Sequence, residues 1–249
     1  MTTVLKLGGS VVTEKDSPET VDHVTLDEVA AAVGAGLETD DGTDLVVVHG
    51  GGSFGHHHAA AHEVTTTDGT HDATAVREIH GAMGALNEAV LDALSGHGVE
   101  AVPVHPLSVA HRNEDGELDL PAAGVDRMLR EGFVPVLHGD VVAHEGKGAT
   151  ILSGDDIVVS LAQSLAADRV GLCSTVPGVL DEDGSVIPTV TAFEDVADAL
   201  GGSDATDVTG GMAGKVRALL DLDVPASIFS PADLSVFLAG GTPGTVVRG

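Results

Sequence analysis

Glycines follow a strand-like segment within residues 44–61, and this pattern is typical of phosphate sites. The apolar run 45–48 is rich in β-branched residues and predicts a buried strand. The glycines at 50–52 come just after it, where bare backbone N–H groups can approach an anionic phosphate. His56 follows four residues after the last of these glycines. We therefore expect its imidazole to lie near the same ligand.

The same order of strand, glycine and polar side chain occurs twice more. Segment 2–7 predicts a strand followed by Gly8-Gly9-Ser10, and segment 133–137 predicts a strand followed by His138-Gly139-Asp140. In an open α/β sheet, ligands bind outside the carboxyl ends of the parallel strands. The three glycine turns should therefore converge on one crevice. Gly50, Gly52 and Gly55 have the spacing of the GxGxxG pattern of dinucleotide-binding enzymes, but this short pattern alone is a weak signal, and we expect no nicotinamide cofactor.

Lysine is scarce in this chain, so its four positions are informative. The sequence holds 39 Asp and Glu against 11 Lys and Arg. Lys6 lies in the first predicted strand, and Lys215 lies in the first turns of a predicted amphipathic helix. A lysine near a helix start opposes the helix dipole unless an anion binds there, so Lys215 predicts an anion site. Lys15 and Lys147 lie in polar loops, where solvation alone accounts for them.

The remaining segments alternate between helix and strand patterns. Helices are predicted over 25–37 with Thr25 and Glu28 as a capping box, over 72–97 with soft breaks at its glycines, over 121–131, and over 153–167 with Ser153 as cap. Further helices start at Thr191, with Glu194 as box partner, and at the glycines before Lys215, and a short one spans 231–239. Strands are predicted over 99–104, 169–173, 226–229 and 244–248, and the segment 105–120 has no regular pattern. We expect one α/β domain over 1–249 with a mostly parallel sheet.

Composition excludes several classes of protein. The formal charge of −28 argues against nucleic acid and anionic membranes as partners. The acids are spread over loops and helix faces, which is typical of proteins in a cytoplasm with molar salt. No apolar run is long enough to span a membrane. The single cysteine, Cys173, excludes an internal disulfide and is expected to be a buried thiol.

The histidines after His56 raise the alternative of a metal site. His58 and His62 are spaced to share one helical face. However, no acidic residue completes a metalloenzyme pattern near them, so we expect no protein-bound metal and one functional histidine, His56.

The motifs KLGGS, HGGGSFGH, HGD, SGDD and TGGMAGKV occur in this order over nearly the whole chain. In this respect the sequence resembles the amino acid kinase superfamily and, through GSFGH above all, its isopentenyl phosphate kinases. The resemblance implies an open αβα sandwich, with an acceptor-binding N-terminal part and a nucleotide-binding part from about 150 to 249. It also implies a cytoplasmic homodimer that transfers the γ-phosphoryl group of Mg²⁺-ATP to isopentenyl phosphate.

The resemblance further implies a role for individual residues. Lys6 and Lys215 would neutralise the transferred group, Lys15 would stabilise the transition state, and Asp155 would orient the lysines. His56 would hydrogen-bond the acceptor phosphate. The backbone or side chains at the ATP site would be those of Lys6, Leu7, Gly8, Gly9, Ser10, Gly52, Thr175, Gly211 and Lys215, and those at the acceptor site would be Gly51, His56 and Gly139. Thr175 replaces the Asp that many of these kinases carry before the Val-Pro-Gly turn.

Two alternatives remain open at this stage. One is a related kinase with another acceptor, such as fosfomycin, UMP or an acylamino acid. Carboxylate acceptors tend to recruit arginine, and none of the seven arginines lies in a glycine motif. The other is a nucleotide- or oxyanion-binding relative without activity. A binder of that kind would need fewer cations than the set Lys6, Lys15 and Lys215.

Overall fold

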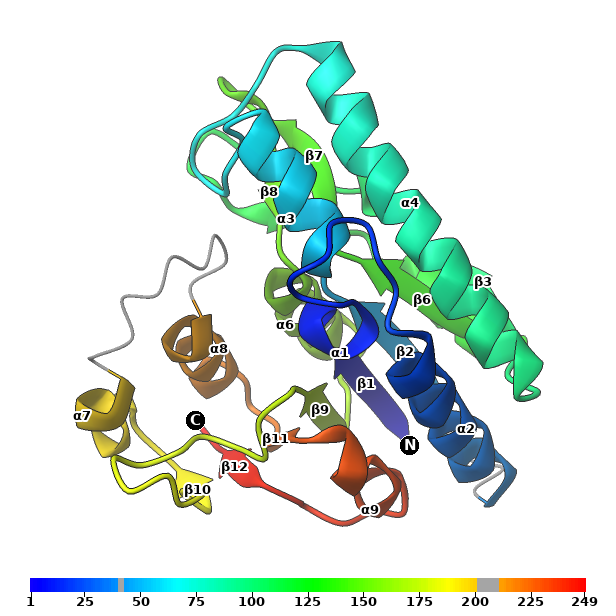
Figure 1. The fold of residues 1–249 in the computed structure, drawn as a ribbon, viewed down its shortest axis with the longest axis vertical. Helices are drawn as coiled ribbons and strands as arrows, with labels where there is room; N and C mark the ends of the chain where they lie inside the picture. Colours follow the sequence, from blue (N-terminus) through cyan, green and yellow to red (C-terminus); the bar gives the residue numbers. More distant parts are fainter. Residues whose placement is uncertain (40–42, 201–210) are drawn as a thin grey trace.

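The computed structural model describes residues 1–39, 43–200 and 211–249, which form helices around two β-sheets (Figure 1). Strands of the larger sheet lie in the order β10 (Thr189–Val190), β12 (Thr245–Val247), β11 (Ala226–Phe229), β9 (Arg169–Cys173), β1 (Thr2–Leu7), β2 (Asp44–His49), β6 (Val134–His138) and β3 (Ala101–Pro103). Neighbouring strands are parallel except β11 and β12. The predicted mostly parallel sheet is therefore confirmed.

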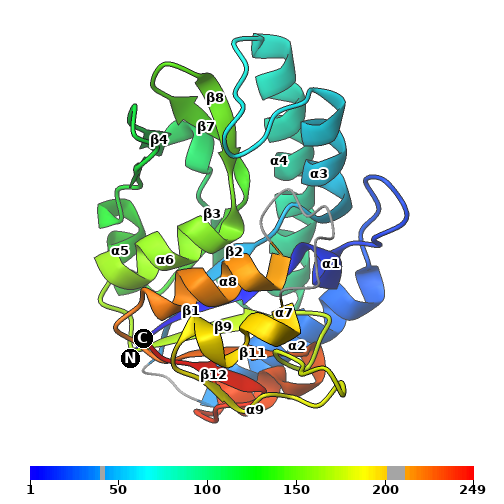
Figure 2. The ribbon, with the colours of Figure 1, turned by 90° about the vertical axis from the view of Figure 1, so that its left-hand side faces the viewer.

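Helices cover both faces of this sheet. The helices are α1 (Gly9–Val12), α2 (His23–Thr39), α3 (Gly52–Ala61), α4 (Ala73–Gly96), α5 (Ala123–Arg130), α6 (Gly154–Ser164), α7 (Ala197–Leu200), α8 (Gly211–Leu220) and α9 (Leu234–Leu238). Short 3₁₀ turns are η1 (Pro106–Ser108), η2 (Phe193–Asp195) and η3 (Pro231–Asp233). Figure 2 shows α6 and α8 running alongside each other across the strands.

The core lies on both sides of the central strand β1, because side chains of a strand alternate between its faces. Val4 packs in the cluster formed with α5, α6 and α8, whereas Leu5 and Leu7 pack in the cluster formed with α2, α4 and α9. All three side chains are fully buried. A strand buried on both faces needs apolar residues, which Val4, Leu5 and Leu7 provide in a segment that also holds two threonines at its start and Lys6 near its end.

The smaller sheet extends beyond one end of the larger one, beside α3 and α4 (Figure 1). Its strands lie in the order β5 (Leu118–Asp119), β4 (His111–Arg112), β7 (Asp140–His144) and β8 (Gly148–Leu152). The β7–β8 pair is an antiparallel hairpin whose turn contains Lys147, between glycines of positive φ at 146 and 148. The prediction of an irregular segment over 105–120 is therefore wrong, since β4, β5 and η1 lie in it.

Two predicted helix caps are also wrong. The helix expected from Thr25 begins at His23, and the Asp22 side chain accepts hydrogen bonds from the backbone N–H and hydroxyl of Thr25. Near Thr191 the capping carboxylate is that of Asp195 and not that of Glu194, because Asp195 accepts from the N–H groups of Thr191 and Ala192. Ser153 does cap α6, and its Oγ accepts from the N–H of Asp156 at 3.1 Å.

Three further expectations can be compared with the described residues. Helix α4 is continuous through Gly81 and Gly84, so the predicted soft breaks are wrong. Cys173 is buried as expected, and burial raises the pKa of its thiol to about 12. Within the described ranges, no helix is long and apolar enough to cross a membrane.

Candidate active site

The three predicted glycine turns are bonded to one another in a row along the edge of the sheet. Gly139 N–H donates to the carbonyl of His49, Gly50 N–H to that of Leu7, and Gly8 N–H to that of Cys173, at 2.9 to 3.0 Å. Each turn therefore closes over the end of the neighbouring strand in the order β6, β2, β1 and β9. The convergence expected from the sequence is confirmed.

Two of these turns interlock so tightly that a side chain cannot enter. A Cβ atom built on Gly9 would lie 2.3 Å from the backbone nitrogen of Gly52, and one on Gly50 would lie 2.7 Å from that of Gly9. Gly52 also has a φ of +48°, in the left-handed region that favours glycine. Close packing of backbone thus requires these glycines even before a ligand is considered.

Helices α1 and α3 start at the first two turns and lack a side-chain cap in the described structure. The N-cap residues Gly8 and Gly51 have no side chain to accept from the first N–H groups, and neither helix has an acidic residue in its first turn. In α3 the N–H of Ser53 donates to the hydroxyl of Thr13 at 3.0 Å. Such N-termini attract anions through their unpaired N–H groups and the helix dipole. Helix α6 differs, since Ser153 caps it and Asp155 and Asp156 lie in its first turn.

Asp155 joins two lysines that are 209 positions apart in the sequence. Its Oδ1 lies 2.6 Å from Nζ of Lys6, and its Oδ2 lies 3.9 Å from Nζ of Lys215. The side chains of Lys6 and Asp155 are almost fully buried, at 7% and 11% exposure. One carboxylate thus places two ammonium groups close together on β1 and α8, at the mouth of the glycine turns.

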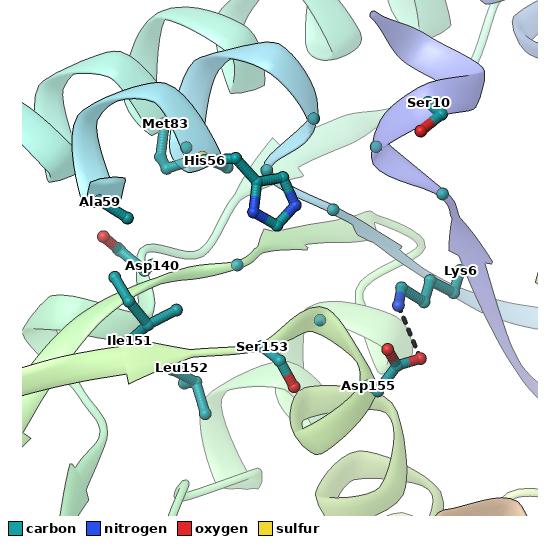
Figure 3. Close-up of a pocket in the computed structure, with 18 of the residues that line it drawn as sticks. Lys6, Ser10, His56, Ala59, Met83, Asp140, Ile151, Leu152, Ser153 and Asp155 are labelled. Carbon is teal, nitrogen blue, oxygen red and sulfur yellow. Dashed lines mark ion pairs between the residues drawn. The ribbon is translucent and has the colours of Figure 1, made fainter. Parts of the chain in front are cut away.

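These groups line one pocket of about 890 Å³, including its opening to solvent. Figure 3 shows Lys6 and Asp155 at one side of it, and the His56 imidazole pointing into it from α3. The opposite side is apolar except for Asp140 and is lined by Ala59, Ile79, Met83, Ile151 and Leu152. The pocket therefore has a cationic, N–H-rich end and a mainly apolar end.

Most of the residues expected at the site do line this pocket. They are Lys6, Gly8, Gly9, Ser10, Gly51, Gly52, His56, Gly139, Asp155, Thr175 and Lys215. Leu7 does not, since its side chain is buried in the core next to β1. Gly211 begins α8 without lining the pocket, and its carbonyl accepts a hydrogen bond from Lys215 at 3.3 Å. The TGG motif before Lys215 otherwise lies in 201–210, outside the described residues.

Lys15 is exposed and does not line the pocket, but its loop is attached to the site. The N–H of Glu19 donates to the carbonyl of Ser53, and the Glu19 carboxylate pairs with His58 of α3. Glu19 holds a φ of +51°, which is uncommon for a residue with a side chain. The loop that carries Lys15 is therefore fixed to the same helix that presents His56.

Sequence reasoning placed Asp140 in a turn at the crevice without assigning it a role, and it missed the apolar wall. Asp140 follows His138 and Gly139, so its position after a strand was a usable signal. Ile79 and Met83 come from the middle of α4, and Ile151 comes from β8. Nothing in their local patterns distinguishes them from core residues, because only the packing of α4 against the hairpin brings them to the pocket.

The histidines after His56 have other partners. His58 pairs with Glu19, and His62 pairs with Glu78 at 2.6 Å. Among the residues that the structure describes, no three His, Cys, Asp or Glu side chains are arranged to hold a metal ion. The two pocket acids are engaged by cationic side chains, Asp155 by the lysines and Asp140 by His80.

Comparison with known proteins agrees with this geometry. The model of the amino acid kinase family matches residues 1–222. The chain is 67% identical to the isopentenyl phosphate kinase of Haloferax volcanii, over 99% of this chain and 98% of that one. It is 33% identical to that of Methanocaldococcus jannaschii, over 87% and 85% of the two chains. A solved structure described as isopentenyl phosphate kinase superposes with a TM-score of 0.79 at 26% identity, covering 99% and 100% of the two chains. The chain therefore belongs to the amino acid kinase family and groups with its isopentenyl phosphate kinases.

Proposed function

We propose that the chain transfers the γ-phosphoryl group of ATP to isopentenyl phosphate, giving isopentenyl diphosphate and ADP. The observation that carries this proposal is the two-ended pocket, in which Lys6, Asp155 and Lys215 lie at one end and an apolar wall at the other. Isopentenyl phosphate has the same two-part character, with a phosphate and a short branched hydrocarbon chain. The relatives at 67% and 33% identity bear the name of this activity.

The cationic end suits the phosphoryl group in transfer. Phosphoryl transfer depends on positioning and on neutralising the charge spread over the phosphoryl oxygens. Lys6 and Lys215 would supply two charges there, and Asp155 would hold both ammonium groups in place. The N–H groups at the start of α1 would bind ATP phosphates, together with Ser10 and Thr175. Lys15 would approach from its loop when both substrates are bound.

The acceptor end suits a phosphate monoester. His56 and the backbone at Gly51 and Gly139 would hydrogen-bond its phosphate, while Ile79, Met83 and Ile151 would contact its hydrocarbon chain. A phosphate monoester has a second pKa of about 6 and is largely a dianion at neutral pH. One of its oxygens can attack the γ-phosphorus directly, while the bond to the β,γ-bridging oxygen breaks and ADP leaves. No general base is required for that step.

Magnesium would arrive with the nucleotide. The pocket acids are held by Lys6, Lys215 and His80, which leaves the described side chains poorly suited to a protein-bound cation. When bound with ATP, Mg²⁺ would neutralise phosphate oxygens. We further propose that the protein works as a homodimer, as the family resemblance implies, and in a cytoplasm rich in salt. The charge of −28 supports the second point, because it is tolerated best where salt screens self-repulsion.

The test is a comparison of acceptors. ADP release is measured with Mg²⁺-ATP in about 2 M KCl, where surface charges are strongly screened. Isopentenyl phosphate, fosfomycin, UMP and N-acetylglutamate serve as the four acceptors. We expect turnover with isopentenyl phosphate only. Turnover with another acceptor alone would contradict the proposed substrate, and ATP binding without any turnover would contradict the proposed activity.

A further inference from the structure

Asp140 is a fully buried carboxylate in the wall of the pocket, and the proposed reaction gives it no role. Its side chain has no exposure to solvent, yet it lies at the pocket near His56, Ala59 and Ile151 (Figure 3). A buried carboxylate is costly unless it is compensated by a cation or by hydrogen bonds. An uncompensated one would also repel an anionic acceptor in the same pocket.

Three groups donate hydrogen bonds to Asp140. The backbone N–H groups of Val141 and Leu107 do so at 2.8 and 3.3 Å. Nδ1 of His80, on α4, contacts both carboxylate oxygens at 3.0 and 3.1 Å. Since the N–H groups are uncharged, His80 is the one of these three that can carry a full positive charge.

His138 also lies near this carboxylate, but it is poorly suited to be the cation. Its Nδ1 lies 3.9 Å from Asp140 and donates to the carbonyl of Gly139 at 2.9 Å. Its Nε2 lies 3.0 Å from Nδ1 of His105 and can accept a hydrogen bond from that nitrogen. Burial lowers the pKa of His138, so its neutral form is favoured. His80 is partly exposed at 30%, and its hydrogen bond to Asp140 raises its pKa.

We infer that His80 is a positioning residue for the acceptor: as the counter-cation of Asp140, it cancels the negative charge in the acceptor wall and fixes the Gly139–Asp140 turn. This inference rests on the proposed function, because it concerns binding of the acceptor phosphate. Lys6 and Lys215 balance Asp155 at one end of the pocket, and His80 balances Asp140 at the other. The two carboxylates therefore have separate cations.

The inference predicts a dependence of acceptor binding on pH through the charge of His80. The titratable groups that face His80 are Asp140 from β7, His138 from β6, and His105 from the segment before η1. Loss of the His80 proton, as the pH rises through its raised pKa, leaves the pocket with one uncompensated negative charge. Acceptor binding should then weaken, although the acceptor phosphate itself is unchanged above neutral pH.

Four variants test this. His80→Asn removes the cation, and the double variant with Asp140→Asn removes both charges while keeping one side-chain oxygen at 140 that can accept from the N–H of Val141. His80→Lys keeps the charge at pH 9. His97→Asn is the matched control. His97 forms a similar pair with Asp27, with 2.8 Å between Nε2 and Oδ1, and neither residue lines the pocket. Acceptor KM, ATP KM and kcat are measured at pH 7 and 9, and calorimetry measures isopentenyl phosphate binding without ATP.

We expect His80→Asn to raise acceptor KM about tenfold, with ATP KM unchanged, since it leaves one uncompensated negative charge in the wall of the acceptor pocket. The double variant should recover most of this loss, and His80→Lys should bind the acceptor equally well at pH 7 and 9. A double variant no better than His80→Asn, or an unchanged KM in His80→Asn, would overturn the inference. Wild-type protein that binds isopentenyl phosphate without turning it over would overturn the proposed function alone.

Discussion

The ammonium of Lys6 and the carboxylate of Asp155 form an ion pair 2.6 Å long that is almost fully removed from solvent. Lys6 is the last residue but one of the central strand β1, whereas Asp155 lies in the first turn of α6. The Ser153 hydroxyl caps this helix by accepting from the N–H of Asp156, so the Asp155 carboxylate is not needed as a cap. The carboxylate is thus available to hold a lysine on each side.

Replacing Asp155 with Asn should lower kcat by about 100- to 1000-fold, a loss typical for removal of one preorganised electrostatic group. The lysines would lose their common partner and with it their fixed separation. Breaking a buried pair also destabilises proteins by about 3–5 kcal/mol, so circular dichroism must first establish that the variant is folded. Asp156→Asn is the control, because Asp156 lies in the same turn but pairs with Arg112. Equal losses in both variants would contradict the role of Asp155.

Replacing His56 with Ala should impair the acceptor and spare ATP. A hydrogen bond to a charged group contributes about 1.5–3 kcal/mol, so kcat/KM for isopentenyl phosphate should fall roughly 10- to 100-fold while ATP KM stays constant. The exposed neighbour His57 serves as control in the same helix. Steady-state kinetics with each substrate varied in turn measures both parameters. An effect confined to ATP KM would mean that His56 contacts ATP and not the acceptor.

Gly9→Ala should destabilise the fold, because its Cβ would lie 2.3 Å from the backbone nitrogen of Gly52. Overpacking of this kind costs about 1–3 kcal/mol. Gly81→Ala is the matched variant: it lies inside α4 with no atom within 4 Å of its added Cβ, and should stabilise the helix by about 0.5–1 kcal/mol. Thermal unfolding at fixed KCl compares the two. Similar melting temperatures would show that the glycine turns are less tightly interlocked than they appear.

Acid should destabilise the protein in a way that depends on His49. Burial, with a smaller effect of neighbouring His138, lowers the pKa of His49 to about 3 from its ordinary value of 6.5. Between these two values the unfolded chain binds a proton at this position and the folded chain does not. Stability from this group is therefore complete above pH 6.5 and is lost as the pH falls towards 3, by about 1.4 kcal/mol per pH unit.

Denaturant unfolding at several pH values between 7 and 4 measures this slope. His49→Gln should flatten it, whereas the exposed His111→Gln should leave it unchanged. Parallel pH profiles for wild type and His49→Gln would contradict the assignment. Salt concentration must be held constant, because the acidic surface also responds to salt.

Local patterns in the sequence were sufficient for the strands and glycine turns of the site. Segments 169–173 and 226–229 coincide with β9 and β11. A short apolar run bounded by polar residues is typical of a buried strand and too short for most helices. Lys215 could be singled out by its unfavourable place near a helix start. Its partner could not be derived from spacing, and the resemblance to the kinase family supplied Asp155.

What the sequence could not provide depends on tertiary contacts or on competition between neighbouring residues. Asp22 and Thr25 are both good helix caps, and the structure uses the first. Strands of two residues, such as β4 and β5, carry too little pattern to be recognised. The contact of His80 with Asp140 joins residues 60 positions apart, and only the packing of α4 against the hairpin creates it.

The balanced charges of the pocket have a consequence for how fast substrates arrive. Both proposed substrates are polyanions, and they must approach a molecule whose formal charge is −28. The 11 Lys and Arg offset only a small part of the charge of 39 Asp and Glu, and the two lysines of the pocket, Lys6 and Lys215, are already shared with Asp155. Long-range attraction is therefore absent, and the diffusional encounter is slowed by repulsion until salt screens it. Association rates should rise with ionic strength, the reverse of the usual behaviour of proteins that steer phosphate ligands by charge.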